Sequence, residues 1–312
     1  MRSIRPFIAV TVTAGACVLM ITFAACKSAT PTLHRTFATP EDAVRALTAA
    51  VKAPGKDQLQ AIFGPDAQEL VDTSDPAGQR AREVFTAAVA ERWRLEDQSP
   101  TSKTLVIGNE DWPFPIPITK EASGWRFDTA QGKEEVLTRR IGRNELAAIL
   151  IARTYVTAQR LYARRPHDGK PAGLYAMSFR SDPGRENGLY WPAQRGQRRS
   201  PLGDLLAQAA ADRNRPAPEG QPQSPFHGYY FKILTGQGAA AAGGASDYIK
   251  NGEMKGGFAL VAWPADYYAT GIMTFVVNQD GVVREKDLGP DTGTAVRAMT
   301  LYNPDDSWGS LR

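Results

Sequence analysis

The side chains with the widest chemical range in this sequence are few and far apart. The 312 residues include three histidines, His34, His167 and His227, and two cysteines. Zinc sites use His, Cys or carboxylate ligands at short spacings such as His-x-x-x-His or Cys-x-x-Cys. Neither spacing occurs in the chain, so we predict no metal and no bound cofactor. His227, just before Tyr229 and Tyr230, is interpreted as an ordinary residue at a strand edge, and it is also the best single candidate for acid–base chemistry.

Patterns typical of nucleophilic, acid–base and nucleotide chemistry are incomplete. The sequence has no Gly-x-Ser-x-Gly turn. Glu110 and Asp111 are adjacent, so on a strand they would point to opposite faces and would not act on one bond. The glycine-rich run 235–244 follows a predicted strand, but Gly244 and Ala245 stand where a phosphate-binding loop needs Lys and then Ser or Thr. We therefore interpret this run as a flexible connection and predict no nucleotide binding.

Tryptophans that lie beside Gly or Pro offer a different chemistry, because an exposed indole can stack on a sugar or a peptide. They are Trp112, Trp125, Trp191 and Trp263. A buried indole fills the core instead, and burial is the favoured interpretation for large aromatic side chains. If the exposed alternative holds, we expect Trp112 and Trp191 to form a ligand or partner surface with His227 and Tyr229.

The start of the chain has the order of an export signal. A positive flank precedes an uncharged apolar stretch, 6–25, and small residues then lead to Cys26 and a polar segment. This order resembles a bacterial lipoprotein signal. The resemblance implies that 1–25 is a signal peptide, that Cys26 becomes the lipidated first residue and that 26–35 is a tether.

Two other interpretations of the start stay open: ordinary signal cleavage, and an uncleaved anchor helix, since about 20 apolar residues can span a bilayer. All three interpretations imply that the remainder of the chain is exported. We therefore expect the protein at the periplasmic face of a bacterial membrane, attached to that membrane by lipid. If cleavage precedes Cys26, the mature chain has a single cysteine and no intrachain disulfide is possible.

Composition and charge exclude several broad classes of protein. Hydrophobic residues make up 42% of the chain and aromatic residues 9%, which is enough to bury a sizeable core and too much for a disordered chain. The formal net charge is +4, and Arg2 and Arg5 account for half of it. A dedicated nucleic-acid binder would show a stronger basic excess, so we predict no nucleic-acid partner. The length fits one large domain or two of ordinary size.

Residues 36–132 are predicted to form an N-terminal α+β lobe. Thr39 and Pro40 are the expected cap and first residue of a helix. The helix over 79–95 is expected to bury a side marked by Val84, Trp93 and their neighbours. The alternating prolines after Trp112 indicate an edge or extended segment. The expected helices are 40–51, 59–63 and 79–95, and the expected strands are 104–107, 112–118 and 125–128.

A long helix over 133–165 is predicted to lead into the second lobe, 133–312. Leu146, Leu150 and Leu161 belong to an approximate apolar stripe that is expected on its buried side. About 30 residues at a rise of 1.5 Å give a length of about 45 Å, enough to link two lobes. The arginines scattered around this helix are interpreted as a solvated face or a salt-bridge network.

After the long helix the pattern predicts loops and then a sheet. Residues 166–227 are loop-rich, with a short helix at 202–211. Asp280-Gly281 before a β-branched pair is a hairpin signal. The strand-like runs predict an antiparallel meander. These runs are 228–234, 257–263, 271–277 and 282–286.

Several strings of the sequence are similar to a known family. The most specific are Gly-Asn-Glu-Asp-Trp-Pro-Phe-Pro-Ile-Pro at 108–117, Gly-Leu-Tyr-Trp-Pro at 188–192, His-Gly-Tyr-Tyr-Phe-Lys-Ile-Leu-Thr at 227–235 and Gly-Gly-Phe-Ala-Leu-Val-Ala-Trp-Pro at 256–264. Through these strings, residues 36–312 resemble the bacterial family called domain of unknown function 2950. The resemblance implies an exported envelope protein with no established activity, so it supplies no catalytic residues. The second half also resembles a pilin or pseudopilin head.

These observations lead to one fold class and two functional hypotheses. We predict an α+β protein with N-terminal helices and a small antiparallel sheet, a long connecting helix and a C-terminal pilin-like antiparallel meander. The first hypothesis is an exported envelope lipoprotein that acts as a non-enzymatic binding or assembly module for an envelope protein partner. The alternative is an enzyme or ligand binder acting on envelope glycans or peptides in a cleft between the lobes, near Trp112, Trp191 and His227.

Overall fold

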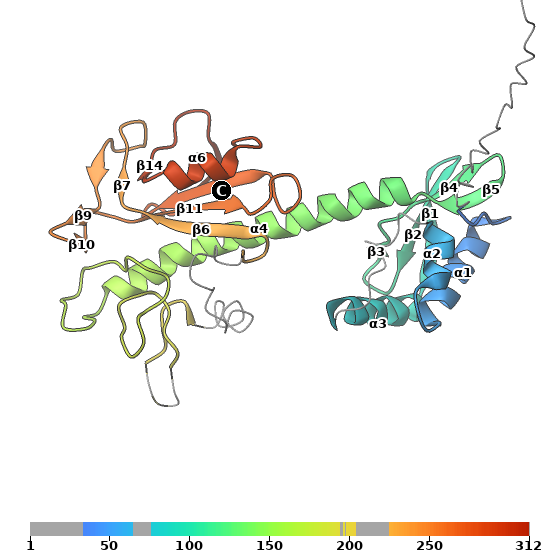
Figure 1. The fold of residues 1–312 in the computed structure, drawn as a ribbon, viewed down its shortest axis with the longest axis horizontal. Coiled ribbons are helices and arrows are strands. Elements are labelled where there is room, and N and C mark those ends of the chain that lie inside the picture. Colours follow the sequence, from blue (N-terminus) through green and yellow to red (C-terminus); the bar gives the residue numbers. More distant parts are fainter. Residues whose placement is uncertain (1–33, 65–75, 194–195, 197, 204–224, 312) are drawn as a thin grey trace, which may run out of the picture.

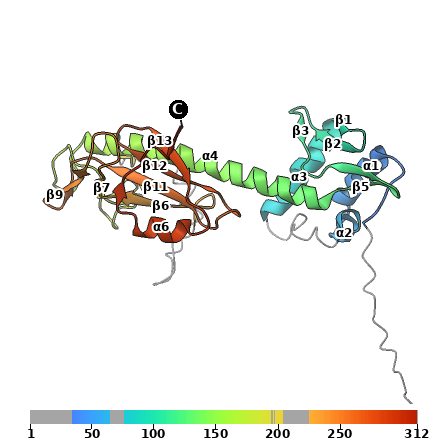
Figure 2. The ribbon, with the colours of Figure 1, turned by 90° about the horizontal axis from the view of Figure 1, so that it is seen from above.

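The protein has an α+β fold in which two lobes lie at opposite ends of one long helix, α4 (Thr129–Ala163) (Figures 1 and 2). The predicted signal peptide 1–25 and Cys26 lie outside the described residues, as do most of the tether 26–35 and of the helix expected at 202–211. The computed structural model describes residues 34–64, 76–193, 196, 198–203 and 225–311.

The N-terminal lobe packs helices against an antiparallel sheet. The strand order is β1-β2-β4-β5, and the short β3 pairs with β2. A core of its own lies between the helices and the sheet. The helices are α1 (Pro40–Lys52), α2 (Asp57–Phe63) and α3 (Pro76–Glu91). The strands are β1 (Trp93–Ser99), β2 (Ser102–Ile107), β3 (Trp112–Pro113), β4 (Ile118–Glu121) and β5 (Gly124–Phe127).

The start of α1 and the end of α2 follow from the local sequence. The Thr39 hydroxyl accepts a hydrogen bond from the Asp42 amide at 3.1 Å, which confirms the cap predicted before Pro40. Leu47 is buried on the inner face of α1. α2 ends where Gly64 adopts a φ of +81°, a left-handed conformation that glycine enters without a steric penalty.

The prediction of one helix over 79–95 is wrong at its C-terminal end. α3 stops at Glu91, and Trp93 begins β1, which pairs with β2 along its length. Of the predicted buried side, Phe85 and Ala88 pack against the core, but Val84 is exposed and Val89 is buried instead. Pairing with β2 outweighs helical propensity here, since it supplies the backbone groups of this segment with partners.

The C-terminal lobe is built on an antiparallel sheet, as the sequence predicts. Its strand order is β15-β13-β12-β11-β6. At the turn between β12 and β13 the Gly281 amide donates to the Asn278 carbonyl oxygen at 3.0 Å, which confirms the hairpin expected at Asp280-Gly281. The strands are β6 (Tyr229–Leu234), β11 (Ala259–Pro264), β12 (Met273–Asn278), β13 (Val283–Asp287) and β15 (Gly309–Leu311).

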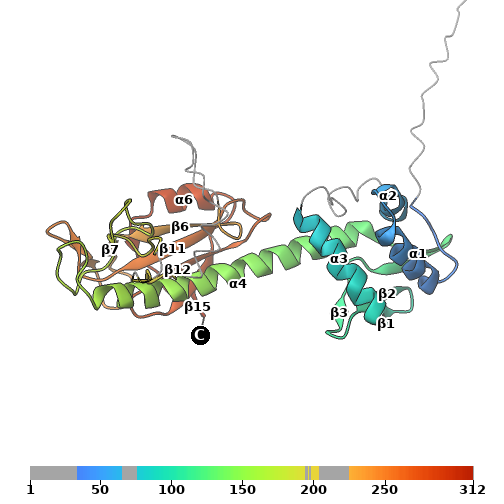
Figure 3. The same cartoon turned by 90° about the horizontal axis from the view of Figure 1, so that it is seen from below.

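Helices cover both faces of this sheet. α4 packs against one face, and α6 (Thr292–Ala298) lies on the other (Figures 1 and 3). The two central strands, β11 and β12, are therefore buried on both sides. This explains why the runs Ala259–Ala262 and Phe275–Val277 are continuously apolar rather than alternating.

The glycine-rich run 235–244 wraps around the buried side chain of Gln237. Its Nε2 donates to the carbonyl oxygens of Ala242 and Gly244 at 2.9 and 2.8 Å, and its Oε1 accepts from the Tyr248 hydroxyl at 2.9 Å. The run contributes one of several short strands that pair with one another at one end of the lobe, so it is more ordered than the flexible connection we expected. They are β7 (Gly236–Gln237), β8 (Ser246–Asp247), β9 (Ile249–Lys250), β10 (Glu253–Met254) and β14 (Leu301–Tyr302).

α4 joins the two lobes through both of its ends. It begins at Thr129, four residues earlier than predicted, because the Asp128 carboxylate accepts from the Gln131 amide at 3.1 Å and caps the helix. Gly132 allows close packing on the N-terminal lobe, since a Cβ there would lie 2.6 Å from Ile116 Cγ1. The 35 residues of α4 span about 52 Å at 1.5 Å per residue.

Candidate functional site

Trp112 lies in the N-terminal lobe and is 44% exposed. Its ring packs at a steep angle against Phe114, with the centroids 6.2 Å apart. The Arg139 guanidinium of α4 lies over the indole, 5.6 Å from its centroid, and also donates to the Pro113 carbonyl oxygen at 2.6 Å. The exposed indole therefore helps to fasten β3 to the start of α4.

The other three predicted surface residues lie in the C-terminal lobe. Trp191 is buried, and its Nε1 donates to the Arg198 carbonyl oxygen at 3.0 Å. Tyr229 is fully buried and donates to the Met273 carbonyl oxygen at 2.9 Å, and burial raises its pKa. His227 is exposed, at a φ of +45° before β6. The structure thus places Trp112 and His227 at the surface, in different lobes, and packs Trp191 and Tyr229 inside.

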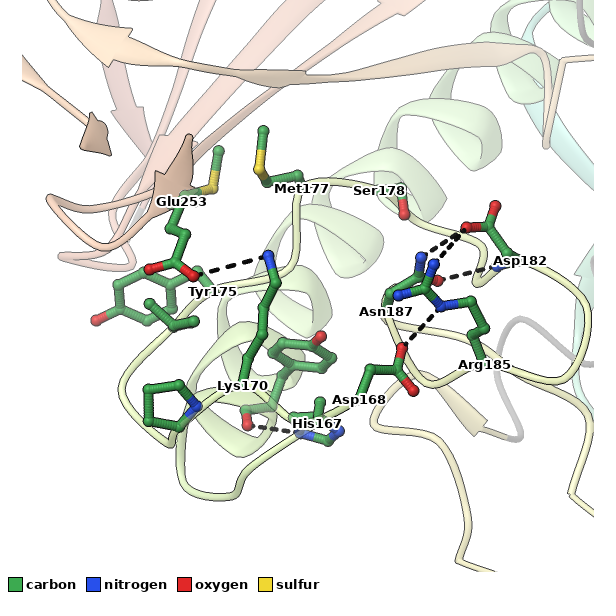
Figure 4. A pocket seen from close by; sticks show the side chains of 14 residues that line it. His167, Asp168, Lys170, Tyr175, Met177, Ser178, Asp182, Arg185, Asn187 and Glu253 are labelled. Carbon is green, nitrogen blue, oxygen red and sulfur yellow. Dashed lines mark hydrogen bonds and ion pairs between the residues drawn. The ribbon is translucent and has the colours of Figure 1, made fainter. Parts of the chain in front are cut away.

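A cavity of about 270 Å³ lies in the C-terminal lobe, beyond the last turn of α4 (Figure 4). The loop that follows α4 forms most of its wall, and β10 closes another side. We call it the α4-end cavity. Residues that line it include Tyr162, His167, Asp168, Lys170, Tyr175, Met177, Asp182, Arg185, Asn187 and Glu253.

Charged side chains of both signs face this cavity in loose pairs (Figure 4). Lys170 Nζ lies 3.7 Å from Glu253 Oε1. Arg185 lies between two carboxylates, with Nε 3.4 Å from Asp168 Oδ2 and Nη1 4.0 Å from Asp182 Oδ2. Each separation exceeds the roughly 2.7–2.9 Å of a direct charge-assisted hydrogen bond, so these groups keep hydrogen-bonding capacity.

His167 lines one side of the cavity. Its Nε2 lies 2.9 Å from the Tyr162 carbonyl oxygen and must carry a proton to donate there, and its ring stacks on Tyr162 with the centroids 3.9 Å apart. Its buried Nδ1 has no hydrogen-bond partner, although Glu186 Oε2 lies 3.4 Å away, out of line for a hydrogen bond. Burial, with the carboxylates of Asp168 and Glu186 nearby, raises the pKa of Tyr162 to about 12.

The second candidate surface is the outer face of α4. Leu146, Leu150 and Leu161, predicted on the buried side, are instead 68%, 55% and 43% exposed. At about 100° per residue they lie opposite the alanines and Tyr155 that contact the sheet, and this packing decides which stripe is buried. We call this exposed surface the Leu/Arg face. It consists of Arg143, Leu146, Leu150, Arg153, Thr157, Leu161 and Arg164.

The sequence gives no motif for either surface. The cavity charges come from positions as distant as Asp168 and Glu253, which only the folded loops bring together. The one local hint is Asp168-Gly169, where both residues adopt positive φ values in a turn after α4. Within the described residues, no group of three or more His, Cys, Asp or Glu side chains could hold a metal ion. None of the helices that the structure describes is long and apolar enough to cross a membrane.

Comparison with known proteins identifies a family. Neither a curated protein nor a solved structure matches the chain, so the pilin-like form of its second half stays a prediction. Residues 34–311 match the family described as protein of unknown function (DUF2950). This match confirms the resemblance of the sequence strings and covers both lobes and the helix between them. The chain therefore belongs to the DUF2950 family.

Proposed function

We propose that this protein is an exported bacterial envelope lipoprotein that works as a non-enzymatic binding module and holds a partner protein on its Leu/Arg face. The N-terminal pattern supports export and lipidation at Cys26. The cavity chemistry supports binding rather than catalysis, because the Ser178 hydroxyl donates to the Arg180 carbonyl oxygen at 2.9 Å rather than to a base.

The observation that carries this proposal is the exposure of leucines on one side of α4. Leu146, Leu150 and Leu161 lie within about 60° of one another around the helix, over a length of about 22 Å. A row of large apolar side chains rimmed by polar ones marks an interaction surface. Full burial of one leucine is worth about 1.5–3 kcal/mol, so a partner that covers all three would gain substantially.

The spacing and charge of this face favour a helical, acidic partner. Its residues recur at intervals of three and four, the spacing of positions on one side of a helix that packs against another helix. Arg143 and Arg164 supply charge at its two ends, and no acidic residue occurs from Leu146 to Arg165. A second copy of the chain would therefore set arginines against arginines, whereas an acidic amphipathic helix complements the face.

Lipidation is tested by labelling cells with a fatty-acid analogue and comparing wild type with Cys26→Ser and Cys17→Ser. We expect the membrane-bound, labelled form to be lost in Cys26→Ser and retained in Cys17→Ser, because cleavage before Cys17 would leave only a short apolar core in the signal. Label that persists in Cys26→Ser would rule out this anchor.

Partner binding is tested with a photo-crosslinking residue at Thr157, in the middle of the Leu/Arg face. We expect a covalent adduct whose partner peptide is rich in Asp and Glu. Leu150→Glu in the same background should lower its yield at least about tenfold. Leu301→Glu is the matched control, since Leu301 is 44% exposed but lies on β14, and it should leave the yield unchanged. A yield that Leu150→Glu does not alter, or an adduct with a second copy of this chain, would refute the proposal.

A further inference from the structure

We infer that the α4-end cavity binds a small zwitterion: an amino acid, or a dipeptide with free amino and carboxyl ends. The cavity belongs to the loops of the C-terminal lobe and involves none of the Leu/Arg face, so this inference does not depend on the partner proposed above. Its volume of about 270 Å³ lies just below the usual range of about 300–1,000 Å³ for ligand pockets, which limits the occupant to a small molecule.

The arrangement of charge selects this chemistry. Lys170 and Glu253 form one cluster, and Arg185 with its two carboxylates forms another on the other side of the cavity (Figure 4). Each cluster offers a cation and an anion. A ligand that carries an ammonium and a carboxylate can therefore place each group against an opposite charge.

Ligands with a single sign of charge fit less well. A phosphate held by Lys170 or Arg185 would meet a carboxylate within 4.0 Å of either cation. A diamine would meet the two cations in the same way. A metal ion needs several converging carboxylates, and no such group occurs within the described residues.

The two carboxylates that flank Arg185 are already positioned. The Asp168 carboxylate accepts from the Glu186 amide at 3.2 Å through both of its oxygens, while Asp168 itself sits at a φ of +48° in a tight turn. Asn187 donates to Asp182 Oδ2 at 2.7 Å and fixes the second carboxylate. Carboxylates that are fixed before the ligand arrives reduce the entropy that binding must overcome.

The wall beside these charges is apolar and adaptable. Tyr175 packs against Phe258 with the ring centroids 4.7 Å apart, so its position is fixed. Met177 and Met254 line the same region, and methionine side chains adjust to differently shaped apolar groups. The wall therefore suits a short aliphatic side chain on the ligand.

The test is calorimetric titration of the full chain in detergent with alanyl-alanine and with alanine. We expect saturable binding of at least one of these zwitterions, and the stronger of the two identifies a peptide end or a free amino acid as the source. N-acetyl-alanyl-alanine keeps only the negative charge and alanyl-alanine amide keeps only the positive charge. Each should bind at least about tenfold more weakly, because it leaves one partner unpaired.

Variants connect this binding to the cavity. Glu253→Gln and Arg185→Gln should each weaken zwitterion binding at least about tenfold. Lys255→Gln is the matched control, because Lys255 also lies 4.0 Å from Glu253 but does not line the cavity, and it should change binding less than about threefold. Unchanged thermal melts of the variants verify their folding.

Three results would overturn the inference. They are the absence of saturable binding for both zwitterions, equal binding of inorganic phosphate or of N-acetyl-alanyl-alanine, and binding that Glu253→Gln and Arg185→Gln leave intact. Equal binding of phosphate would identify an anion site instead.

Discussion

The N-terminal lobe and the α4-end cavity use their charged side chains differently. In the N-terminal lobe the Arg82 guanidinium donates to four backbone carbonyl oxygens around the end of α1, at 2.7–3.3 Å. Arg126 likewise donates to Glu121 at 2.6 Å. The charged pairs of the α4-end cavity are 3.4–4.0 Å apart. These charged side chains of the N-terminal lobe therefore stabilise its fold, whereas those of the cavity are available to a ligand.

The lobes also differ in their tyrosines. All ten tyrosines of the chain lie at or after Tyr155, so the N-terminal lobe contains none. Burial raises the pKa of Tyr155, Tyr162 and Tyr229. The two lobes have separate cores, so a substitution or a pH change can destabilise one lobe and spare the other.

The largest expected effect is that of Gln159→Leu in the C-terminal lobe. The buried Gln159 amide donates to the Ala176 carbonyl oxygen and accepts from the Ala176 amide, both at 2.8 Å. Leucine would leave both backbone groups unpaired, so the free energy of unfolding of this lobe should fall by about 3 kcal/mol. Calorimetric melts measure this loss. Gln131→Leu, an exposed position on the same helix, is the control and should change it by less than about 0.5 kcal/mol.

Arg82→Gln should destabilise the N-terminal lobe by about 2 kcal/mol, because it removes a charged donor from the carbonyl groups around the end of α1. Hydrogen exchange should show faster exchange in that lobe and unchanged exchange in β11 and β12. The same change at the exposed Arg80 of α3 serves as the control. Equal effects of the two substitutions would contradict a structural role for Arg82.

Alkaline pH should destabilise the C-terminal lobe selectively. The pKa of Tyr162 is about 12 in the folded protein and about 10 in the unfolded chain, so the folded state binds its proton more tightly. Its contribution is present below about pH 10 and is lost as pH rises towards 12, at about 1.4 kcal/mol per pH unit. Thermal melts across this range measure the slope, and Tyr162→Phe should reduce it. A steeper loss in the N-terminal lobe would contradict this assignment.

The smallest expected effect on stability is that of replacing a charged side chain of the cavity. Arg185→Gln and Lys170→Gln should change the free energy of unfolding by less than about 0.5 kcal/mol, since both side chains are more than half exposed and their ion pairs are long. Chemical denaturation checks this value. A loss comparable to that of Arg82→Gln would mean that these charges are structural and would remove the contrast between the lobes.

Local signals allowed much of the fold to be predicted. Thr39 caps α1, Gly64 ends α2, and Asp280-Gly281 forms the hairpin that joins β12 to β13, each through chemistry contained in a few neighbouring residues. The apolar runs of β11 and β12 were also found, because strands buried on both faces need no polar alternation.

The features of the fold and of the cavity that could not be predicted from the sequence depend on tertiary packing. The local pattern at Trp93 predicts a helix, because nothing local reveals that its segment pairs with β2. Leu150 is predicted in the core but is exposed, because periodicity does not say which of two apolar stripes meets the sheet. The cavity has no signal in the sequence, since Asp168 and Glu253 are 85 positions apart in the chain and meet only after both loops have folded.

The continuity of α4 also sets how the lobes are oriented about their common axis. Space is open around Gly142, where a Cβ would have no heavy atom within 4 Å. One residue inserted there would turn one lobe relative to the other by about 100° and separate them by only about 1.5 Å. Seven residues would nearly restore the rotation, to within about 20°, while separating the lobes by about 10 Å. A change in the length of α4 thus alters the angle between the two lobes far more than the distance between them. A binding event that needs both lobes would therefore be sensitive to that angle first.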